Sequence, residues 1–416
     1  MERNIELVAV NEDSIVPGLV GFYFAFRLAI PILSVNLLGM DLQTGSMLKL
    51  AAGFLVFGAV CFVSFGAATR AWTWLLEPLS IRWVLIYLSF SLCSFLWSET
   101  ASATASLAYW CGTAADVATV LVLFRIGNAV DTAVDLQKGF IYGACSIALV
   151  AWIMPAQDDL RLGVDNLFNA NSICNVCAFA VFFAQYLMRR KQMKLVTIPL
   201  FLVVTIVRSL SKTTIAAFLV SEVYVLIQDR TMSRKTKLLL TSFATLIILI
   251  FWGLFEAYYN VYTTTGNQAE TLTGRTAIWS YVANAAVDRP WIGHGFDSMW
   301  NVVPTFGTFE ARHAENELLE QFYSYGIVGL GLLAGVYGSL YFDIRRRALD
   351  SVRVIFMSVL LFVVVRGFAE AEPFDLLLPL WTVTLISLLV RQDEIEAALR
   401  LHRDPNDVQV GHPVAN

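Results

Sequence analysis

Two cationic residues of this 416-residue chain lie in a short turn between hydrophobic segments, where charged side chains are unusual. Arg208 and Lys212 are four residues apart in the run RSLSKTT, which joins two hydrophobic segments. Charge at the edge of a membrane is costly unless it is paired or functional. Arginine binds phosphate through parallel hydrogen bonds, and lysine binds it as a point charge. The pair therefore predicts a phosphate or diphosphate site, or else ion pairs with Glu370 or Glu372.

A second group of polar residues precedes a later hydrophobic segment. The run ARHAENELLEQFYSYG predicts a helix that continues into the membrane, and spacings of three and four place on one of its faces His313, Asn316, Glu317 and Glu320. We interpret this face as part of a site, with a solvated helix end as the alternative. At the end of another hydrophobic segment, Arg366 is spaced to pair with Glu370.

The composition indicates which elements must hold these residues. Hydrophobic residues make up 57% of the chain and charged residues 15%, whereas soluble proteins have about 45–50% apolar and about 25% charged residues. We therefore predict an all-α polytopic membrane protein with about twelve transmembrane helices. The expected spans lie near 17–39, 48–68, 82–98, 104–125, 139–155, 171–188, 195–208, 213–228, 238–255, 321–341, 353–370 and 374–390. The seventh and eighth are short, and a hairpin that dips only partly into the bilayer is the alternative for them.

Other classes of partner and site are excluded or disfavoured. The net charge of −4 offers no basic surface for nucleic acid. The CxxC pair Cys174 and Cys177 lies in a hydrophobic run without a second pair or a nearby histidine, so we interpret it as helix packing. Arg27 and Asp116, inside spans, are expected to be packing partners or lining residues. We predict neither a metal site nor a cofactor.

Basic residues indicate the orientation, because they accumulate in cytoplasmic loops. With both termini in the cytoplasm, most of the 29 basic residues fall on that side. The prediction divides the chain into spans one to nine (1–255), an outer loop with two short helices (256–320), spans ten to twelve (321–390) and a cytoplasmic tail (391–416). Long ordered loops usually carry function, so we expect the outer loop to be catalytic.

Within this loop, LTGRTAIWSYVANAAVDRP predicts an amphipathic helix. Thr273 is expected to cap the helix and Pro290 to end it. The expected apolar face consists of Ile278, Trp279, Val282 and Ala286.

Several enzyme classes can be set aside. The chain has no Walker motif, no HExxH, no G-x-S-x-G and no outer DxD pair. Because nucleotides are absent outside a bacterial inner membrane, a reaction on that side needs a preformed donor. A lipid diphosphate in the bilayer would serve.

Two runs of the sequence resemble the O-antigen ligase and polysaccharide polymerase superfamily. They are GRTAIWSYVANAAVDRPWIGHGFDSMW and, after it, RHAENELLEQFYSYGIVGL. The matching positions are Gly274, Arg275, Trp279, Pro290, Gly293, Gly295, Asn316, Leu319, Gly326 and Gly329. Upstream, SLSKTT resembles the family's S-x-S-R/K-T turn, and RLGVDNLFNANS resembles its segment with Arg161, Gly163 and Asn171. The resemblance covers about residues 155–345 and is closest to the exopolysaccharide polymerase (succinoglycan-type) branch.

The resemblance implies a GT-C-like membrane enzyme in the bacterial inner membrane, a metal-independent inverting glycosyltransferase. Its donor would be an oligosaccharide linked to undecaprenyl diphosphate, used at the periplasmic face of the lipid bilayer, and other polysaccharide export proteins would be possible partners. Arg208, Lys212, Arg275 and Arg161 would neutralise the departing diphosphate. The remaining expected substrate-binding residues are Asn171, Asn316 and Arg366. The small residues Gly331, Gly335 and Gly338, with Ala334, would let the tenth span pack closely and brace the site.

One position departs from the family pattern. Members place histidine directly before the asparagine that corresponds to Asn316, but here Glu315 holds that place and His313 stands two residues earlier. A two-residue step on a helix turns about 200°, so both can reach one pocket only if the helix begins after them. We favour His313 as the base that deprotonates the acceptor hydroxyl, with Glu315 as the alternative.

Three functions remain open. An exopolysaccharide polymerase is preferred, and an O-antigen ligase that transfers glycan to lipid A core is the alternative. A transporter of lipid-linked glycan is a remoter possibility, because its polar residues would lie at the bilayer midplane and not at outer helix ends.

Overall fold

The computed structural model describes residues 15–67, 69–157, 160–164, 168–264, 272–304, 313–347 and 350–403. The described residues are nearly all helical, which confirms the all-α class. In chain order the helices are α1 (Val16–Phe26), α2 (Ile30–Leu38), α3 (Leu42–Ser64), α4 (Trp72–Leu75), α5 (Leu79–Cys93), η1 (Ser94–Leu96), α6 (Ala103–Ile126), α7 (Ala129–Ile153), α8 (Ala170–Arg189), α9 (Thr197–Arg208), α10 (Lys212–Gln228), α11 (Arg234–Ile250), α12 (Trp252–Thr264), α13 (Leu272–Ala286), η2 (Met299–Asn301), α14 (Glu317–Arg346), α15 (Ser351–Gly367) and α16 (Leu380–Arg403).

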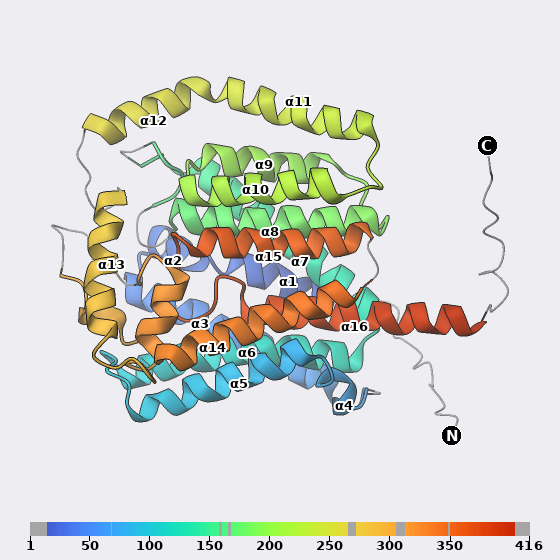
Figure 1. The fold of residues 1–416 in the computed structure, drawn as a ribbon, viewed down its shortest axis with the longest axis horizontal. Helices are drawn as coiled ribbons and strands as arrows, with labels where there is room; N and C mark the ends of the chain where they lie inside the picture. Colours follow the sequence, from blue (N-terminus) through green and yellow to red (C-terminus); the bar gives the residue numbers. More distant parts are fainter. Residues whose placement is uncertain are drawn as a thin grey trace.

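Most of the long helices lie side by side in one stack (Figure 1). α13 stands across one end of the stack, at the left of the view, and α4 lies at the other end. α8 lies within the stack against α7, α9, α10 and α15, and its aromatic side chains Phe182, Phe183 and Tyr186 are fully buried. The bent pair α11–α12 runs along one side, where Ile247 is the buried side chain of α11.

The helices define a multi-pass membrane protein. In the part of the chain that the structure describes, six helices are long and apolar enough to cross a membrane, or up to eight if each bent pair is one span. The bent pairs are α1 with α2, at 73°, and α11 with α12, at 47°. The short predicted spans correspond to α9, with 12 residues, and α10, with 17. The total of twelve therefore stays a prediction.

Side-chain caps fix the beginnings of two helices that carry polar residues. Asn169 accepts a hydrogen bond from the N–H of Ser172 at 2.7 Å, which begins α8. Asn316 accepts one from the N–H of Leu319 at 3.0 Å, which begins α14. Such caps satisfy N–H groups that have no partner within the helix. As a result α14 begins at Glu317, and the predicted helical face that included His313 is wrong.

α14 is kinked at Gly326, where φ is 63°. The turn that follows α13 fits into this kink: the carbonyls of Pro290 and Trp291 accept hydrogen bonds from the helix just beyond it, at 2.8 and 3.2 Å. The N–H groups of residues 294 and 295 donate to the helix just before it, at 3.0 and 2.8 Å. A Cβ atom at Gly326 would lie 2.4 Å from the carbonyl carbon of Trp291, so glycine is required here. These hydrogen bonds hold the turn after α13 in a fixed position against α14.

The predicted packing role of the glycines further along α14 is confirmed at one of three positions. A Cβ at Gly335 would lie 2.3 Å from the ring of Trp83, so this glycine allows the approach of α5. Cβ atoms at Gly331 and Gly338 would meet nothing within 4 Å among the described residues. Those two positions face away from neighbouring helices, and the prediction for them is wrong.

Candidate functional site

The carboxylate of Glu370 lies at the centre of a polar cluster. Glu370 follows α15 in a non-helical segment, residues 368–379, and only 4% of the residue is exposed. Its Oε1 accepts hydrogen bonds from Nη2 of Arg275 at 3.1 Å and from Nδ2 of Asn171 at 2.6 Å. Nη2 of Arg366 lies 3.8 Å from Oε2 of the same carboxylate. Polar groups from three helices thus surround one carboxylate: they come from the beginning of α8, from α13 and from the end of α15. The predicted pairing of Arg366 with Glu370 is confirmed.

Arg366 is buried to an unusual degree for an arginine, with 1% of the residue exposed. Its Nε donates to Oγ1 of Thr214 at 3.3 Å, and Nη2 lies 4.0 Å from Oε1 of Glu372. Its Nη1 is buried and has no hydrogen-bond partner among the described residues. An unsatisfied buried N–H is costly. A charged guanidinium group with such an N–H is well suited to bind a further anionic group.

The turn between α9 and α10 supplies hydroxyl groups to this cluster. Leu210 in this turn has a φ of 59°, a left-handed conformation. Ser211 donates to Oδ1 of Asn171 at 2.7 Å, and Nη1 of Arg275 donates to Oγ1 of Thr213 at 3.1 Å. Nη2 of Arg161 also donates to Oδ1 of Asn171, at 2.9 Å. The run SLSKTT therefore positions the amide of Asn171 and the guanidinium group of Arg275.

His313 and Glu315 lie together on the less buried side of the cluster. Nε2 of His313 is 3.8 Å from Oε1 of Glu315, whose Oε2 is 3.3 Å from Nη2 of Arg275. The N–H of Glu315 also donates to Nδ1 of His313 at 3.3 Å. Because α14 begins only at Glu317, the two side chains can meet despite their two-residue spacing.

The backbone at Glu315 is strained. Its φ of 53° is rare for a residue with a side chain. Strained backbone of this kind concentrates at functional sites and persists only where the surroundings impose it. Here Trp279 helps to impose it, because its Nε1 donates to the carbonyl of Glu315 at 3.3 Å. Trp279 lies one turn after Arg275 on the same face of α13. This face therefore contacts Glu315 twice: Trp279 contacts its carbonyl and Arg275 contacts its carboxylate.

The surroundings raise the pKa of both candidate bases. Burial alone would lower the pKa of His313, but the negative charges of Glu315, Glu370 and Glu320 outweigh it and the pKa is raised. Burial raises the pKa of Glu315, and the charge of Glu370 adds to this, while His313 and Arg275 oppose it. The surroundings therefore favour the protonated form of either group, and so favour proton uptake by both candidate bases.

The other predicted site residues lie around this cluster. Nη1 of Arg208 donates to the carbonyl of Leu160 at 2.8 Å, not to Glu370 or Glu372. Lys212 is exposed, with its Nζ 5.1 Å from the centre of the Tyr258 ring. Nδ2 of Asn316 donates to the carbonyl of Phe368 at 3.0 Å, which ties the beginning of α14 to the segment that carries Glu370.

Glu317 and Glu320 have supporting roles. Oε1 of Glu317 accepts hydrogen bonds from the hydroxyl of Tyr337 at 2.7 Å and from the N–H of Leu377 at 2.8 Å. Glu320 accepts one from the N–H of Ala314 at 2.6 Å. Glu320 thus fixes the backbone between the two candidate bases, and Glu317 ties the beginning of α14 to the segment that follows α15.

α13 is anchored by its apolar face. Ile278, Val282 and Ala286 are buried and pack with Tyr323 of α14. The predicted amphipathic helix is therefore confirmed at these three positions. Trp279 is half-buried and contacts the segment of Glu315 instead. The helix ends at Ala286, four residues before Pro290, and the side chain of Thr273 lies outside the described residues.

Arg289 and His294, in the turn that follows α13, form a separate contact with Glu99. Nη2 of Arg289 is 2.5 Å from Oε1 of Glu99, so its partner is Glu99. Nδ1 of His294 lies 3.1 Å from the other oxygen of Glu99. Inside the bundle, Arg27 and Asp116 pair with each other, as packing partners would. Cys174 and Cys177 are buried in the core, which fits their interpretation as packing residues.

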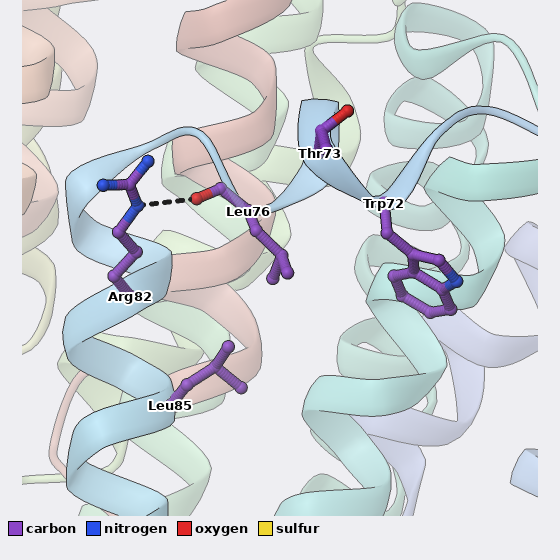
Figure 2. A pocket seen from close by; sticks show the side chains of 5 residues that line it. All are labelled: Trp72, Thr73, Leu76, Arg82 and Leu85. Carbon is purple, nitrogen blue, oxygen red and sulfur yellow. Dashed lines mark hydrogen bonds between the residues drawn. The ribbon is translucent and has the colours of Figure 1, made fainter.

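Two further observations concern chemistry outside the cluster. Among the described residues, no group of three or more His, Cys, Asp or Glu side chains could hold a metal ion. Figure 2 shows a pocket of about 500 Å³ lined by Trp72, Thr73, Leu76, Arg82 and Leu85. It lies around α4, at the opposite end of the stack from α13. Arg82, its one charged lining residue, donates from Nε to the carbonyl of Leu76 at 2.8 Å. The pocket therefore offers no acid–base pair.

A comparison with protein families agrees with the geometry. The family described as O-antigen ligase matches residues 195–334. This stretch contains the turn between α9 and α10, all of α13 and the beginning of α14. The match supports the predicted superfamily over residues 195–334, the stretch that carries Arg275, His313 and Glu315, and with it glycan transfer of the ligase or polymerase type. No curated protein matches the chain.

Sequence reasoning missed the central residue of the cluster. Glu370 was considered only as a partner of a nearby cation, because a lone acidic residue after a span carries no motif. It lies beyond the matched residues 195–334, as do Asn171 and Arg161. Ser211, Thr213 and Thr214 belong to the run SLSKTT, in which the charge of the lysine is the more obvious feature. The alternation of hydroxyl residues in SLSKTT was the available signal.

Proposed function

We propose that the protein transfers oligosaccharide from an undecaprenyl diphosphate carrier at the periplasmic face of the inner membrane, as an exopolysaccharide polymerase. The observation that carries this proposal is the convergence of Arg275 and Arg366 on one buried carboxylate, next to His313 and Glu315. Cations that bind an anion beside a general base are what transfer from a lipid diphosphate requires. The family match supports the use of a lipid-linked glycan.

In the proposed reaction, an acceptor hydroxyl attacks the anomeric carbon of the lipid-linked glycan. The bond between that carbon and the diphosphate oxygen breaks, and the diphosphate leaves with the electron pair. Arg275 and Arg366 stabilise the negative charge that develops on the leaving oxygen. His313 or Glu315 takes the proton of the hydroxyl. Attack from the face opposite the leaving group inverts the anomeric configuration, and the arginines take the place of a metal ion.

The transmembrane helices suit a substrate with a long lipid chain. The cluster lies where several hydrophobic helices begin or end, at the α13 end of the stack. A diphosphate bound there would leave its polyprenyl chain alongside the apolar helices. The polar residues therefore lie at helix ends, as an enzyme acting at the membrane surface needs, and not at the midpoint of a transport path.

Transfer can be tested with the full-length protein purified in lipid nanodiscs. We expect it to release undecaprenyl diphosphate from a lipid-linked oligosaccharide and to form glycans of two or more repeat units when the donor is the only substrate. Addition of lipid A core tests the alternative, O-antigen ligase activity. If glycan is transferred to lipid A core and no polymer forms, the protein is an O-antigen ligase and not a polymerase. The absence of release with either acceptor would overturn the proposed function.

A further inference from the structure

We propose that Glu370 is an internal anion that occupies, in the empty site, the position that the diphosphate of the substrate takes during the reaction. This inference rests on the proposed function and concerns how the same site binds and releases its donor. Glu370 is then a positioning residue: it holds the arginines in place before the substrate arrives and competes with the diphosphate for them.

The donors around Glu370 are those that a diphosphate would use. Carboxylate and phosphate oxygens accept the same parallel hydrogen bonds from guanidinium groups. Arg275 and Asn171 already donate to Oε1, at 3.1 and 2.6 Å, and Arg366 lies 3.8 Å from Oε2. The carboxylate of Glu370 is therefore surrounded by hydrogen-bond donors from α8, α13 and α15.

The carboxylate satisfies these donors incompletely. The 3.8 Å separation between Arg366 and Glu370 is longer than a hydrogen bond. Nη1 of Arg366 is buried and without a partner among the described residues. A diphosphate has more oxygen atoms than a carboxylate and carries more negative charge. It can satisfy both arginines where Glu370 satisfies mainly one.

The structure also allows Glu370 to yield this position. It lies on the non-helical segment 368–379, so its side chain can withdraw without unwinding a helix. Asn171 remains held by Arg161 and Ser211 when the carboxylate leaves, at 2.9 and 2.7 Å. The side chains of Arg275 and Glu315 are 17% and 16% exposed, which gives an anion access from the side of the candidate bases.

Two consequences follow for the reaction. In the empty protein, Glu370 offsets the mutual repulsion of the two arginines. After transfer, its carboxylate competes with the polyprenyl diphosphate product and so speeds product release. Removing the charge of Glu370 should therefore strengthen anion binding and slow turnover at the same time. A side chain that only supported the fold would weaken both.

The test measures binding of inorganic diphosphate to the full-length purified protein by calorimetry. We expect Glu370→Gln to bind inorganic diphosphate about tenfold more tightly than the unmodified protein, because a competing buried charge is removed. Glu372→Gln is the matched control: it removes a negative charge two residues away whose side chain is 36% exposed and 4.0 Å from Arg366. Its affinity should rise less than that of Glu370→Gln, because the side chain of Glu372 is 36% exposed whereas that of Glu370 is 5% exposed. In transfer assays with lipid-linked oligosaccharide, Glu370→Gln should lower both KM and kcat.

Unchanged or weaker binding of inorganic diphosphate by Glu370→Gln would overturn the inference, and so would no measurable binding to any variant. An equal gain in Glu372→Gln would also overturn it, because the effect would then be one of general charge. If Glu370→Gln does not fold, Glu370→Asp makes the same test: its shorter carboxylate withdraws from Arg275 and should also bind more tightly. Failure of the proposed function is seen separately, as absence of glycan transfer by the unmodified protein.

Discussion

Arg275 and Glu370 are 95 residues apart in the chain, yet Nη2 of the arginine lies 3.1 Å from Oε1 of the carboxylate. The contact joins α13, the helix that stands across one end of the stack, to the segment that follows α15. The residues before α14 connect the same two regions indirectly: Asn316 donates to the carbonyl of Phe368, and Trp279 of α13 donates to that of Glu315. α13 and the membrane bundle thus hold the candidate site jointly.

The identity of the base can be decided from activity as a function of pH. His313→Gln should lower kcat by about a hundredfold or more, which is the usual contribution of a general base. Glu315→Gln should keep measurable activity. A histidine accepts a proton only when neutral, so activity rises as pH passes the pKa of His313, which its acidic neighbours raise. Glu315 is the first of these neighbours, so Glu315→Gln should lower that pKa and move the rise in activity to lower pH.

The opposite pattern would identify the carboxylate as the base. In that case Glu315→Gln would be inactive at every pH, while His313→Gln would still make polymer. A third outcome is that Glu315→Gln is active and its pH profile is the same as that of the unmodified protein. The charge of Glu315 would then have no effect on the pKa of the base.

The kink of α14 makes a prediction about stability. Gly326→Ala should destabilise the protein by about 1–3 kcal/mol from its backbone conformation alone, which is essentially restricted to glycine, and the clash with Trp291 adds to this. The turn after α13 would be displaced, so transfer activity should fall as well. Gly338→Ala is the matched control on the same helix, since its Cβ meets nothing within 4 Å among the described residues. Thermal unfolding in nanodiscs measures the difference, and equal midpoints for the two variants would be inconsistent with the kink as described.

The orientation in the membrane is open to a direct test. Reporter enzymes fused after residue 265 or 305 should report the periplasm, and those fused after 192, 235 or 348 the cytoplasm. The expected asymmetry follows from the basic residues near 189–194 and 230–237. A cytoplasmic signal from residue 265 or 305 would place the cluster away from a periplasmic donor and exclude the proposed reaction.

The sequence predicts local features well and the centre of the site poorly. Each hydrophobic segment contains helix, although the last helix begins at Leu380 and not near residue 374. Three of the four residues of the expected apolar face of α13 are buried. These features follow from periodicity, which is a local property. Glu370 was not predicted as a site residue, since its role depends on Asn171 and Arg275, which approach it only after folding. The beginning of α14 was also misplaced, because Asn316 could continue the helical pattern as well as cap it.

The ion pair of Arg289 with Glu99 supplies the control for the central claim. Arg289 is near α13 but contacts Glu99, outside the cluster of Glu370. Its exposed ion pair should contribute little. Arg208 binds the carbonyl of Leu160, next to Arg161, so its loss should disturb the Asn171 side of the cluster.

The most direct measurement compares the rate of glycan transfer from undecaprenyl diphosphate-linked oligosaccharide by purified full-length variants. Arg275→Ala should reduce this rate by about 10²–10³-fold, because the leaving diphosphate loses a main source of charge stabilisation. Arg208→Ala should also abolish polymer formation at unchanged protein level, while Arg289→Ala should stay within about threefold of the unmodified protein. If Arg289→Ala lost as much activity as Arg275→Ala, or if Arg275→Ala retained full activity, the cluster around Glu370 would not be the site of transfer.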